Sequence, residues 1–393
     1  MSSSLVIVES PTKVKTIKKF LGADYDVRAT MGHVKDLPKS SLGIDLKDGF
    51  TPSYKIIESK KKVIAEIKKA AQKATHIYLA PDPDREGEAI AWHISEEIGG
   101  KNKTIHRALF NDLTRNTVLE AINHPLALDR QKFEAQQTRR ILDRLVGYKI
   151  SPLLWEKVKR GLSAGRVQSV AVRLICDREK EINAFVSEEY WHITASLSGT
   201  NPPAFDSRLV KISGKKAKVT SGEEAEQIMA DLGRQPFLVA RVDKKEIKRQ
   251  PLPPFTTSKL QQEASRWLRF SAKKTMSVAQ QLYEGVELGP DGSVGLVTYM
   301  RTDSVRISEE ALQAVRTYIH DFYPPAFLPP KPRFFKNSAA AQDAHEAIRP
   351  SSLQYRPNDV KQYLTPDQYK LYLLIWNRFV ASQMSPARFD STV

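Results

Sequence analysis

The chain has 393 residues, more than one hydrophobic core usually organises, and this length predicts about two to four domains. Its formal net charge is +16, with 61 basic against 45 acidic residues, which favours a polyanionic partner such as nucleic acid. The only cysteine is Cys176, so internal disulfides and cysteine-rich zinc sites are excluded. Apolar runs are too short for a signal peptide or a membrane span, and we expect a soluble, cytoplasmic protein.

The first 125 residues alternate between short apolar runs and segments of helical period. The expected strands are Leu5–Val8, Tyr25–Thr30, Ile77–Ala80 and Ile105–Phe110, and the expected helices are Pro11–Gly22, Lys60–Ala74, Glu86–Ile98 and Thr114–Asn123. This rhythm predicts a mostly parallel α/β sheet with helices on both faces.

The rest of the chain changes character twice. Residues 126–187 read as helical with breaks around Ser151-Pro152 and Gly161, and residues 188–250 look β-rich. The proline-rich segment Gln250–Pro254 predicts a hinge. Three helices are expected after it, the last one beginning at the N-cap Ser308, before a short β-like end. The fold class is therefore multidomain, combining α/β, helical and β-rich parts.

Four carboxylates follow the expected strands of the sheet. Glu9 ends the first strand, Asp82 and Asp84 end the third, and Glu86 begins the next helix. Ligand sites of open α/β sheets lie at the carboxyl ends of the strands, and oxygen ligands of this kind suit Mg²⁺. The alternative is that one or two of these acids simply cap a helix, which leaves the others unexplained.

A tyrosine beside an arginine lies far downstream. A strand over Gly295–Arg301 would place Tyr299 and Arg301 on one face. A phenol is a weak nucleophile at neutral pH until cations favour its anion, and Arg301 could do this while binding a phosphate. A predicted helix over Asp343–Pro350 would add His345 and Arg349 on one face. Taken alone, Tyr299 is better explained as an ordinary half-buried strand tyrosine, and only the full string around it favours a nucleophile.

A basic stripe is predicted on the first long helix. Arg140, Arg144 and Tyr148 recur at intervals of four residues, a spacing that puts them on one face. Arginines interleaved with an aromatic ring can clamp and stack an unpaired base. An ordinary solvated charged face would have the same pattern.

Taken together, the motifs resemble one family. Glu9 with the later DxDxE acids resembles the Toprim domain of topoisomerases and primases. The strings TYMRTDS at 298–304 and AHEAIRP at 344–350, with ESPTK at 9–13, GH at 32–33, TRRILDRLVGY at 138–148 and LSAGRVQS at 162–169, resemble the bacterial type IA DNA topoisomerases nearly end to end.

The resemblance implies a reaction. Tyr299 would cleave one DNA strand and become linked to its 5′-phosphate, and Glu9 would protonate the leaving 3′-oxygen. The charged intermediate and its surroundings would be stabilised by Lys13, Arg301 and His345. One or two Mg²⁺ ions would lie at Asp82, Asp84 and Glu86 with Glu9 close by. A second DNA segment would pass through the gap before religation, relaxing negative supercoils without ATP and without zinc in this chain.

The resemblance also implies a DNA partner, mainly single-stranded or underwound, and a monomeric protein in the cytoplasm near the nucleoid. The residues implied in DNA binding are His33, Arg107, Arg139, Arg140, Arg144, Tyr148, Arg166, Gln168, Ser169, Asp303 and Arg349.

The domain boundaries expected from the family are a Toprim domain over 1–126, a helical DNA-binding domain over 127–187, a β-rich arch over 188–254, a helical domain with the tyrosine over 255–384 and a return into the arch over 385–393. The resemblance implies that these parts form a partial torus. Because family members continue further, the chain resembles an N-terminal fragment, and we expect it to relax supercoiled DNA poorly.

Two other functions fit part of the pattern. A Toprim nuclease or primase would use the acidic cluster without needing Tyr299, so Tyr299→Phe separates it from a topoisomerase. A non-catalytic single-stranded DNA-binding module would be indifferent both to Mg²⁺ removal and to substitution of Asp82.

Overall fold

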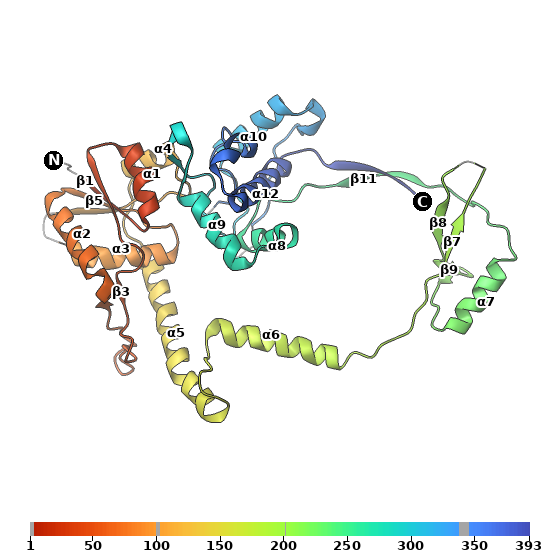
Figure 1. Ribbon diagram of the computed structural model, residues 1–393, viewed down its shortest axis with the longest axis horizontal. Coiled ribbons are helices and arrows are strands. Elements are labelled where there is room, and N and C mark those ends of the chain that lie inside the picture. Colours follow the sequence, from red (N-terminus) through yellow and green to blue (C-terminus); the bar gives the residue numbers. More distant parts are fainter. Residues whose placement is uncertain (1–3, 100–102, 201, 338–345) are drawn as a thin grey trace. The chain divides into compact units, whose positions relative to one another are not determined.

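The structure is a computed structural model that describes residues 4–99, 103–200, 202–337 and 346–393. The chain divides into two compact units. The first contains Met1–Leu162 and Lys248–Phe389, and the second contains Ser163–Ile247 and Asp390–Val393 (Figure 1).

A four-stranded parallel sheet organises the N-terminal part of the first unit, as predicted. Its order is β2-β1-β5-β6, with β1 at Ser4–Val8, β2 at Tyr25–Ala29, β5 at His76–Leu79 and β6 at Thr104–Arg107. The register is regular, since Val6 of β1 lies between Val27 and Tyr78. From β1 the chain turns first to one side of the sheet and later to the other, so the carboxyl ends of β1 and β5 form a topological switch point.

Helices cover both faces of this sheet. They are α1 (Pro11–Leu21), α2 (Lys61–Lys73), α3 (Arg85–Ile98) and α4 (Arg115–Asn123). Buried side chains of α2 and α3, such as Ile67 and Ile94, pack on Leu5 and Ile77 in one hydrophobic core. The core on the opposite face continues from Val6 and Ile17 into the C-terminal half of the unit.

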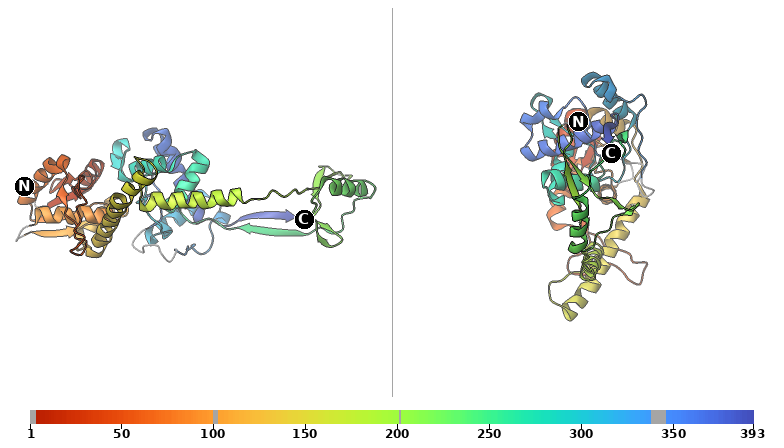
Figure 2. Two further views of the ribbon diagram at one scale, coloured as in Figure 1. Left: turned by 90° about the horizontal axis from the view of Figure 1, so that it is seen from below. Right: turned by 90° about the vertical axis from the view of Figure 1, so that its right-hand side faces the viewer.

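The C-terminal half of the unit is mainly helical, and its main helices agree with the periodicity. They are α8 (Thr257–Leu268), α9 (Ala272–Glu284), α10 (Glu309–Phe322), α11 (Pro357–Val360) and α12 (Pro366–Ser382). Ser308 caps α10, as expected, by accepting a hydrogen bond from the Ala311 N–H. Helix α12 packs against α8 and α9, and the three lie together in the further views of Figure 2.

Two predicted elements around the tyrosine differ from the structure. Residues 295–301 form no continuous strand, and among the described residues they make one bridge, from Val297 to Pro350, so the predicted strand is wrong. The Tyr299 N–H donates to the Asn111 carbonyl oxygen, at 2.7 Å. Residues 346–350, predicted to be helical, form no helix, and Ile348 bridges Phe255. The earlier part of that predicted helix, including His345, lies outside the described residues.

The long helix α5 (Arg130–Lys157) passes through Pro152 without ending, contrary to the predicted break. A proline inside a helix removes one backbone hydrogen bond and crowds the preceding turn, but it need not terminate the helix. The remaining elements of this unit are small. They are β3 (Lys35–Asp36) paired with β4 (Lys55–Ile56), β12 (Val286–Glu287) paired with β13 (Ser293–Val294), and 3₁₀ turns at Glu58–Lys60, Gly289–Asp291, Pro325–Phe327 and Lys361–Tyr363.

The second unit contains α6 (Arg166–Asn183), β7 (Thr194–Leu197), β8 (Phe205–Arg208), β9 (Lys211–Ile212), β10 (Lys215–Lys216) and α7 (Gly222–Leu232). Only part of the β-rich prediction holds, because α7 is a helix and Phe237–Val242 is no strand. The signal for α7 was Ser221 followed by two glutamates, and the Ser221 hydroxyl accepts from the Glu224 N–H. Strands β11 (Lys244–Arg249) and β14 (Ala387–Thr392) pair at the boundary of the units. No helix among the described residues is long and apolar enough to span a membrane.

Candidate active site

The site begins at the end of β1, where the chain turns into α1. The Ser10 hydroxyl caps α1 by accepting from the Lys13 N–H at 3.4 Å, and Pro11 starts the helix with its fixed φ. This turn places Glu9 at the sheet edge and directs Lys13 inward. The Lys13 side chain is fully buried, and its ammonium forms an ion pair with Asp82 at the neighbouring strand end.

The acidic loop after β5 is held in one shape. Asp84 is the N-cap of α3, and its Oδ1 accepts from the Gly87 N–H at 2.9 Å. Gly87 is required here because a Cβ at this position would collide with the carbonyl oxygen of Asp82. The first turn of α3 therefore lies directly against the loop that carries both aspartates.

The buried side chain of Arg107 holds the backbone of this loop. It is 1% exposed, and its guanidinium donates to the carbonyl oxygens of Leu79, Pro81 and Asp82 at 2.7–3.0 Å. It also donates from Nε to Glu88 at 2.8 Å. The guanidinium of Arg107 is buried, so this position does not support the predicted contact between Arg107 and DNA. Its place in the structure is that of a clamp that fixes the backbone of the acidic loop.

Tyr299 reaches the acidic loop from the C-terminal half of the chain. Its ring is 2% exposed, and its hydroxyl donates to Asp84 Oδ2 at 2.6 Å. Arg301 Nη1 lies 3.5 Å from the same oxygen. Although no strand forms here, the two side chains converge on Asp84 as the period-two argument required. The structure thus joins Glu9, Lys13, Asp82, Asp84, Tyr299 and Arg301 into one cluster.

Burial and negative charge keep this tyrosine protonated. Burial raises the pKa of Tyr299 far above the ordinary range, and the nearby charges of Asp82 and Asp84 raise it further, while Arg301 acts in the opposite direction. Burial also raises the pKa of Glu9 above 4.5, with Asp82 adding to the shift and Lys13 opposing it. Glu9 is therefore biased toward the protonated form, which a proton donor requires.

The hydrogen-bond partners of Glu86 differ from those of Asp82 and Asp84. It accepts from Gln136 Nε2 at 2.9 Å and lies 3.3 Å from His33 Nε2. The hydrogen bond from His33 lowers the pKa of Glu86 to about 2, against the effect of burial and with the help of Gln136. His33, predicted to bind DNA, is thus a neighbour of the acidic cluster.

The donor set suits Mg²⁺ in kind, because all four candidate ligands are carboxylates. In this structure Asp82 is paired with Lys13, Asp84 with Tyr299 and Glu86 with His33 and Gln136. Among the described residues, no three side chains that commonly bind metals converge as a ligand group. The predicted metal site therefore stays a prediction.

An open groove runs along the exposed side of the cluster. Its volume is about 620 Å³, and arginines line it together with hydroxyl groups. Three of the predicted site residues outside the metal ligands, Arg139, Arg301 and Asp303, face this groove. Its other lining residues are Asp84, Arg85, Glu86, Thr256, Thr257, Ser258 and Thr302.

The predicted stripe on α5 packs against the loop that follows β3. Arg140 forms a bidentate pair with Asp36, with its closest contact at 2.7 Å. Arg144 donates to the Pro38 carbonyl at 2.7 Å and to the Tyr148 hydroxyl at 2.8 Å, with its guanidinium over the Tyr148 ring. Arg140, Arg144 and Tyr148 are thus held in place by contacts with residues 36–39.

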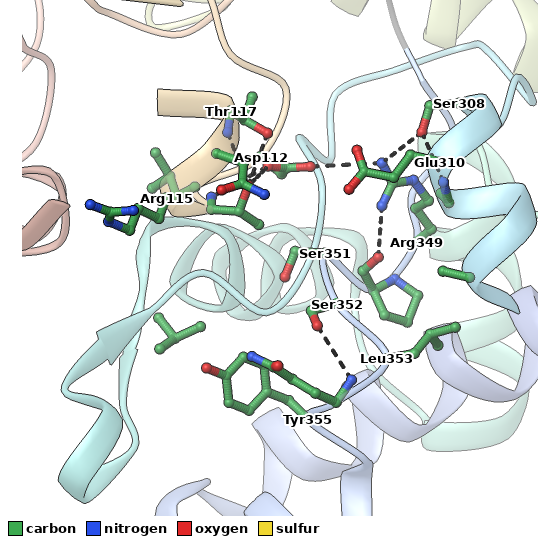
Figure 3. Close-up of a pocket in the computed structure, with 18 of the residues that line it drawn as sticks. Asp112, Arg115, Thr117, Ser308, Glu310, Arg349, Ser351, Ser352, Leu353 and Tyr355 are labelled. Atoms are coloured by element: carbon green, nitrogen blue, oxygen red, sulfur yellow. Dashed lines mark hydrogen bonds and ion pairs between the residues drawn. The ribbon is translucent and has the colours of Figure 1, made fainter. Parts of the chain in front are cut away.

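Arg349 forms part of the wall of a second cavity, of about 400 Å³, between the loop after β6 and α10 (Figure 3). It is 6% exposed, donates to Glu346 at 2.8 Å and lies 3.7 Å from Asp112. This residue of the predicted DNA-binding set thus joins the two halves of the unit. Arg166, Gln168 and Ser169 lie in the first turn of α6, in the other compact unit.

Three residues at the site were not predicted. Glu88 and Gln136 hold Arg107 and Glu86, and Tyr283 of α9 packs against Tyr299. Glu88 carried a signal, because it belongs to the acidic string Asp82–Glu88. Gln136 and Tyr283 carried none, since each fits its helix as an ordinary residue.

Comparisons with known proteins agree with these motifs. Residues 4–113 match the family model of the Toprim domain, and residues 127–393 match a family model described as DNA topoisomerase. The solved structure of full-length topoisomerase I from Thermotoga maritima is 42% identical in sequence, with a TM-score of 0.83. The match covers 99% of this chain and 62% of that one, so this chain spans less than two thirds of that protein.

The Arg107 clamp predicts a large local destabilisation. In Arg107→Met, the Glu88 carboxylate and several carbonyl oxygens lose their donor while remaining buried, which should cost about 3–5 kcal/mol. Hydrogen exchange of the β5 and β6 amides measures this free energy of opening. The control Arg130→Met removes an exposed pair with Glu134 and should cost less than about 0.5 kcal/mol. A loss below about 1 kcal/mol in Arg107→Met would contradict the clamp.

The low pKa of Glu86 predicts a pH-dependent contribution to stability. An acid whose pKa falls from 4.5 to about 2 on folding stabilises the fold above pH 4.5 and loses this effect as the pH falls toward 2. Glu86→Gln should therefore lower the melting temperature at pH 7, measured with EDTA, and the difference from the parent should shrink below pH 4.5. A difference that stays constant from pH 7 to pH 3 would refute this assignment. The exposed Glu58→Gln is the matched control.

Proposed function

The chain belongs to the bacterial type IA DNA topoisomerase family, and from this premise we propose that it breaks and rejoins one strand of DNA through a covalent bond to Tyr299. One observation carries the proposal. The hydroxyl of Tyr299, from the second family segment, donates to Asp84 of the Toprim segment at 2.6 Å. A nuclease or primase would have no need to bury a tyrosine against its acidic cluster.

The proposed cleavage is an in-line displacement at phosphorus. The phenolic oxygen of Tyr299 attacks the phosphate, the bond from phosphorus to the 3′-oxygen breaks, and the protein carries the 5′-phosphate. Asp84 is the acceptor in place for the phenolic proton, because it already takes that hydrogen bond. Glu9, whose pKa is raised mainly by burial, gives a proton to the leaving 3′-oxygen.

Positive charge offsets the charge that develops on the phosphate. Lys13 and Arg301 approach the acidic cluster from opposite sides, Lys13 from α1 and Arg301 from the segment after Tyr299. His345 is proposed to assist from the family motif alone. The reverse reaction restores the DNA strand, and the phosphotyrosine conserves the bond energy, so ATP is not required.

Toprim domains typically bind Mg²⁺, and Glu9, Asp82, Asp84 and Glu86 are the residues proposed to hold it here. When bound, the ion would neutralise charge on the phosphate and on the oxygens around it. Carboxylates that are now paired with Lys13 and Tyr299 would then face the ion. One or two ions are consistent with this number of acids.

DNA is the proposed partner, mainly as single strands or underwound duplex. The groove lined by Arg85, Arg139 and Arg301 offers cationic groups for the backbone next to Tyr299. The Arg140, Arg144 and Tyr148 stripe is proposed to stack and clamp a base upstream of the cut, with Arg166, Gln168 and Ser169 contacting the strand further on. Strand passage, relaxation of negative supercoils, a monomeric state and a cytoplasmic location near the nucleoid follow from the family as parts of the same proposal.

The phenolic oxygen of Tyr299 decides between the proposed enzyme and the alternatives. Tyr299→Phe should abolish the covalent adduct with a labelled single-stranded oligonucleotide, while the oligonucleotide affinity stays within about twofold, because the ring and its packing remain. The readouts are a denaturing gel for the adduct and fluorescence anisotropy for binding. Tyr372→Phe, a buried tyrosine of the same half, should leave adduct formation intact. Cleavage that persists in Tyr299→Phe would indicate a Toprim nuclease instead.

The stripe on α5 makes a separate prediction about binding. Arg140→Ala should weaken oligonucleotide binding and reduce the slope of log K against log salt by about 0.7, since one phosphate contact to a single strand is lost. Arg130→Ala removes an exposed arginine from the first turn of the same helix and should leave the slope unchanged. Equal slopes for both variants would remove Arg140 from the proposed DNA-binding surface.

A further inference from the structure

Tyr283 occupies the centre of the site without belonging to any motif. It lies near the end of α9, and its side chain is fully buried. The ammonium of Lys13 lies 4.8 Å from the centre of its ring. The ring also packs in a tilted, edge-to-face arrangement with that of Tyr299, with the two ring centres 5.3 Å apart and the planes at 67°. One side chain therefore contacts both the buried cation and the proposed nucleophile.

The face of the Tyr283 ring is the second partner of Lys13. The first is the Asp82 carboxylate, and the Lys13 side chain is 0% exposed. A buried ammonium needs partners that replace its lost hydration, and an aromatic face provides negative potential for a cation, most effectively where water is excluded. Asp82 and the Tyr283 ring thus together determine where the Lys13 charge lies.

The packing of the Tyr283 ring against Tyr299 constrains the proposed nucleophile. A tilted, edge-to-face pair has a favoured orientation because the positive edge of one ring meets the negative face of the other. The Tyr299 hydroxyl is directed at Asp84, and the Tyr283 ring limits how far the Tyr299 ring can rotate away from that direction. An apolar side chain without a ring would fill space here but would not impose this angle.

The hydroxyl of Tyr283 has no part in these contacts. Among the residues that the structure describes, no group forms a hydrogen bond with it. Burial raises the pKa of Tyr283 well above its ordinary value, with Asp82 the next cause, so the phenol stays neutral. The two contacts described above belong to the ring alone, which makes the aromatic ring testable apart from the hydroxyl.

The contacts also couple the two halves of the unit. Lys13 and Asp82 come from the Toprim segment, whereas Tyr283 and Tyr299 come from the second family segment. Next to them, Thr16 of α1 donates to the Glu284 carbonyl oxygen at 3.2 Å and pairs with the Ser293 hydroxyl at 2.8 Å. In this arrangement the Tyr283 ring contacts Lys13 and the Tyr299 hydroxyl contacts Asp84 at the same time.

We propose that Tyr283 is a positioning residue of the breakage-and-rejoining reaction, whose ring face fixes the Lys13 ammonium and whose tilted packing against Tyr299 fixes the orientation of that ring. The inference rests on the proposed function, because it assigns Tyr283 a role in that same chemical step. It acts through Lys13 and Tyr299 and touches no DNA. Loss of the ring should therefore slow the chemical step at saturating DNA without changing the affinity for DNA.

The experiment compares Tyr283→Leu with Tyr283→Phe in the chain of 393 residues. Single-turnover adduct formation with a labelled single-stranded oligonucleotide gives the rate of cleavage, and anisotropy gives the affinity. Tyr283→Leu should cleave at least about tenfold more slowly at saturation, because a desolvated cation–π contact is lost, with an affinity within about twofold of the parent. Tyr283→Phe keeps the ring and should cleave within about twofold of the parent rate.

The matched control is Tyr372→Leu. Tyr372 is also fully buried in the same half of the chain, but its hydroxyl donates to the Tyr355 carbonyl oxygen and its ring packs on Trp376, away from the acidic residues. It reports what the loss of a buried ring does to cleavage through stability alone. The role of Tyr283 requires that Tyr372→Leu slow cleavage much less than Tyr283→Leu does.

A graded substitution tests the cation–π contact even if Tyr283→Leu fails to fold. Phenylalanines with one, two and three ring fluorines at position 283 keep the shape of the ring and progressively weaken its negative face. The cleavage rate should fall with each fluorine while the melting temperature stays constant. A flat series, or a Tyr283→Phe that is as slow as Tyr283→Leu, would overturn the inference. If the parent itself forms no adduct, the proposed function fails instead.

Discussion

The site depends on one hydrogen bond, from the Tyr299 hydroxyl to the Asp84 carboxylate at 2.6 Å. It joins residues 215 positions apart, each of which is also held by contacts of its own. Asp84 is fixed by its role as the N-cap of α3, and the loop before it by the buried Arg107. Tyr299 is fixed by its backbone bond to Asn111 and by the ring of Tyr283. The hydrogen bond between Tyr299 and Asp84 thus forms because each residue is held by its own set of contacts.

The same arrangement explains why the Tyr299 hydroxyl stays protonated when neither phosphate nor Mg²⁺ is bound. Asp82 pairs with Lys13, Asp84 pairs with Arg301, and burial among carboxylates holds the Tyr299 phenol in its neutral form. Phosphate and Mg²⁺ would change this balance, because each competes for a group that is now paired within the protein. Under the proposed function, binding of substrate and activation of the nucleophile would then be one event.

Local sequence signals predicted the parts of the fold that local physics determines. The strand–helix alternation, the cap at Ser308 and the placement of Glu9 and Asp82 at strand ends need only short-range information. The failures around the site involve partners distant in sequence. The segment around Tyr299 has strand-like composition, but the bridge to Pro350 and the bond to Asn111 decide its shape. Likewise, nothing near Arg107 shows that it will be buried beneath Asp82.

The most direct test of the account is to identify the residue that carries DNA. Protein mixed with a labelled single-stranded oligonucleotide and Mg²⁺ would be denatured, digested and analysed by mass spectrometry. The account predicts one modified peptide containing Gly295–Arg301, with the nucleotide attached through its 5′-phosphate to Tyr299. Attachment at any other residue, or cleaved DNA with no protein-linked product, would contradict it.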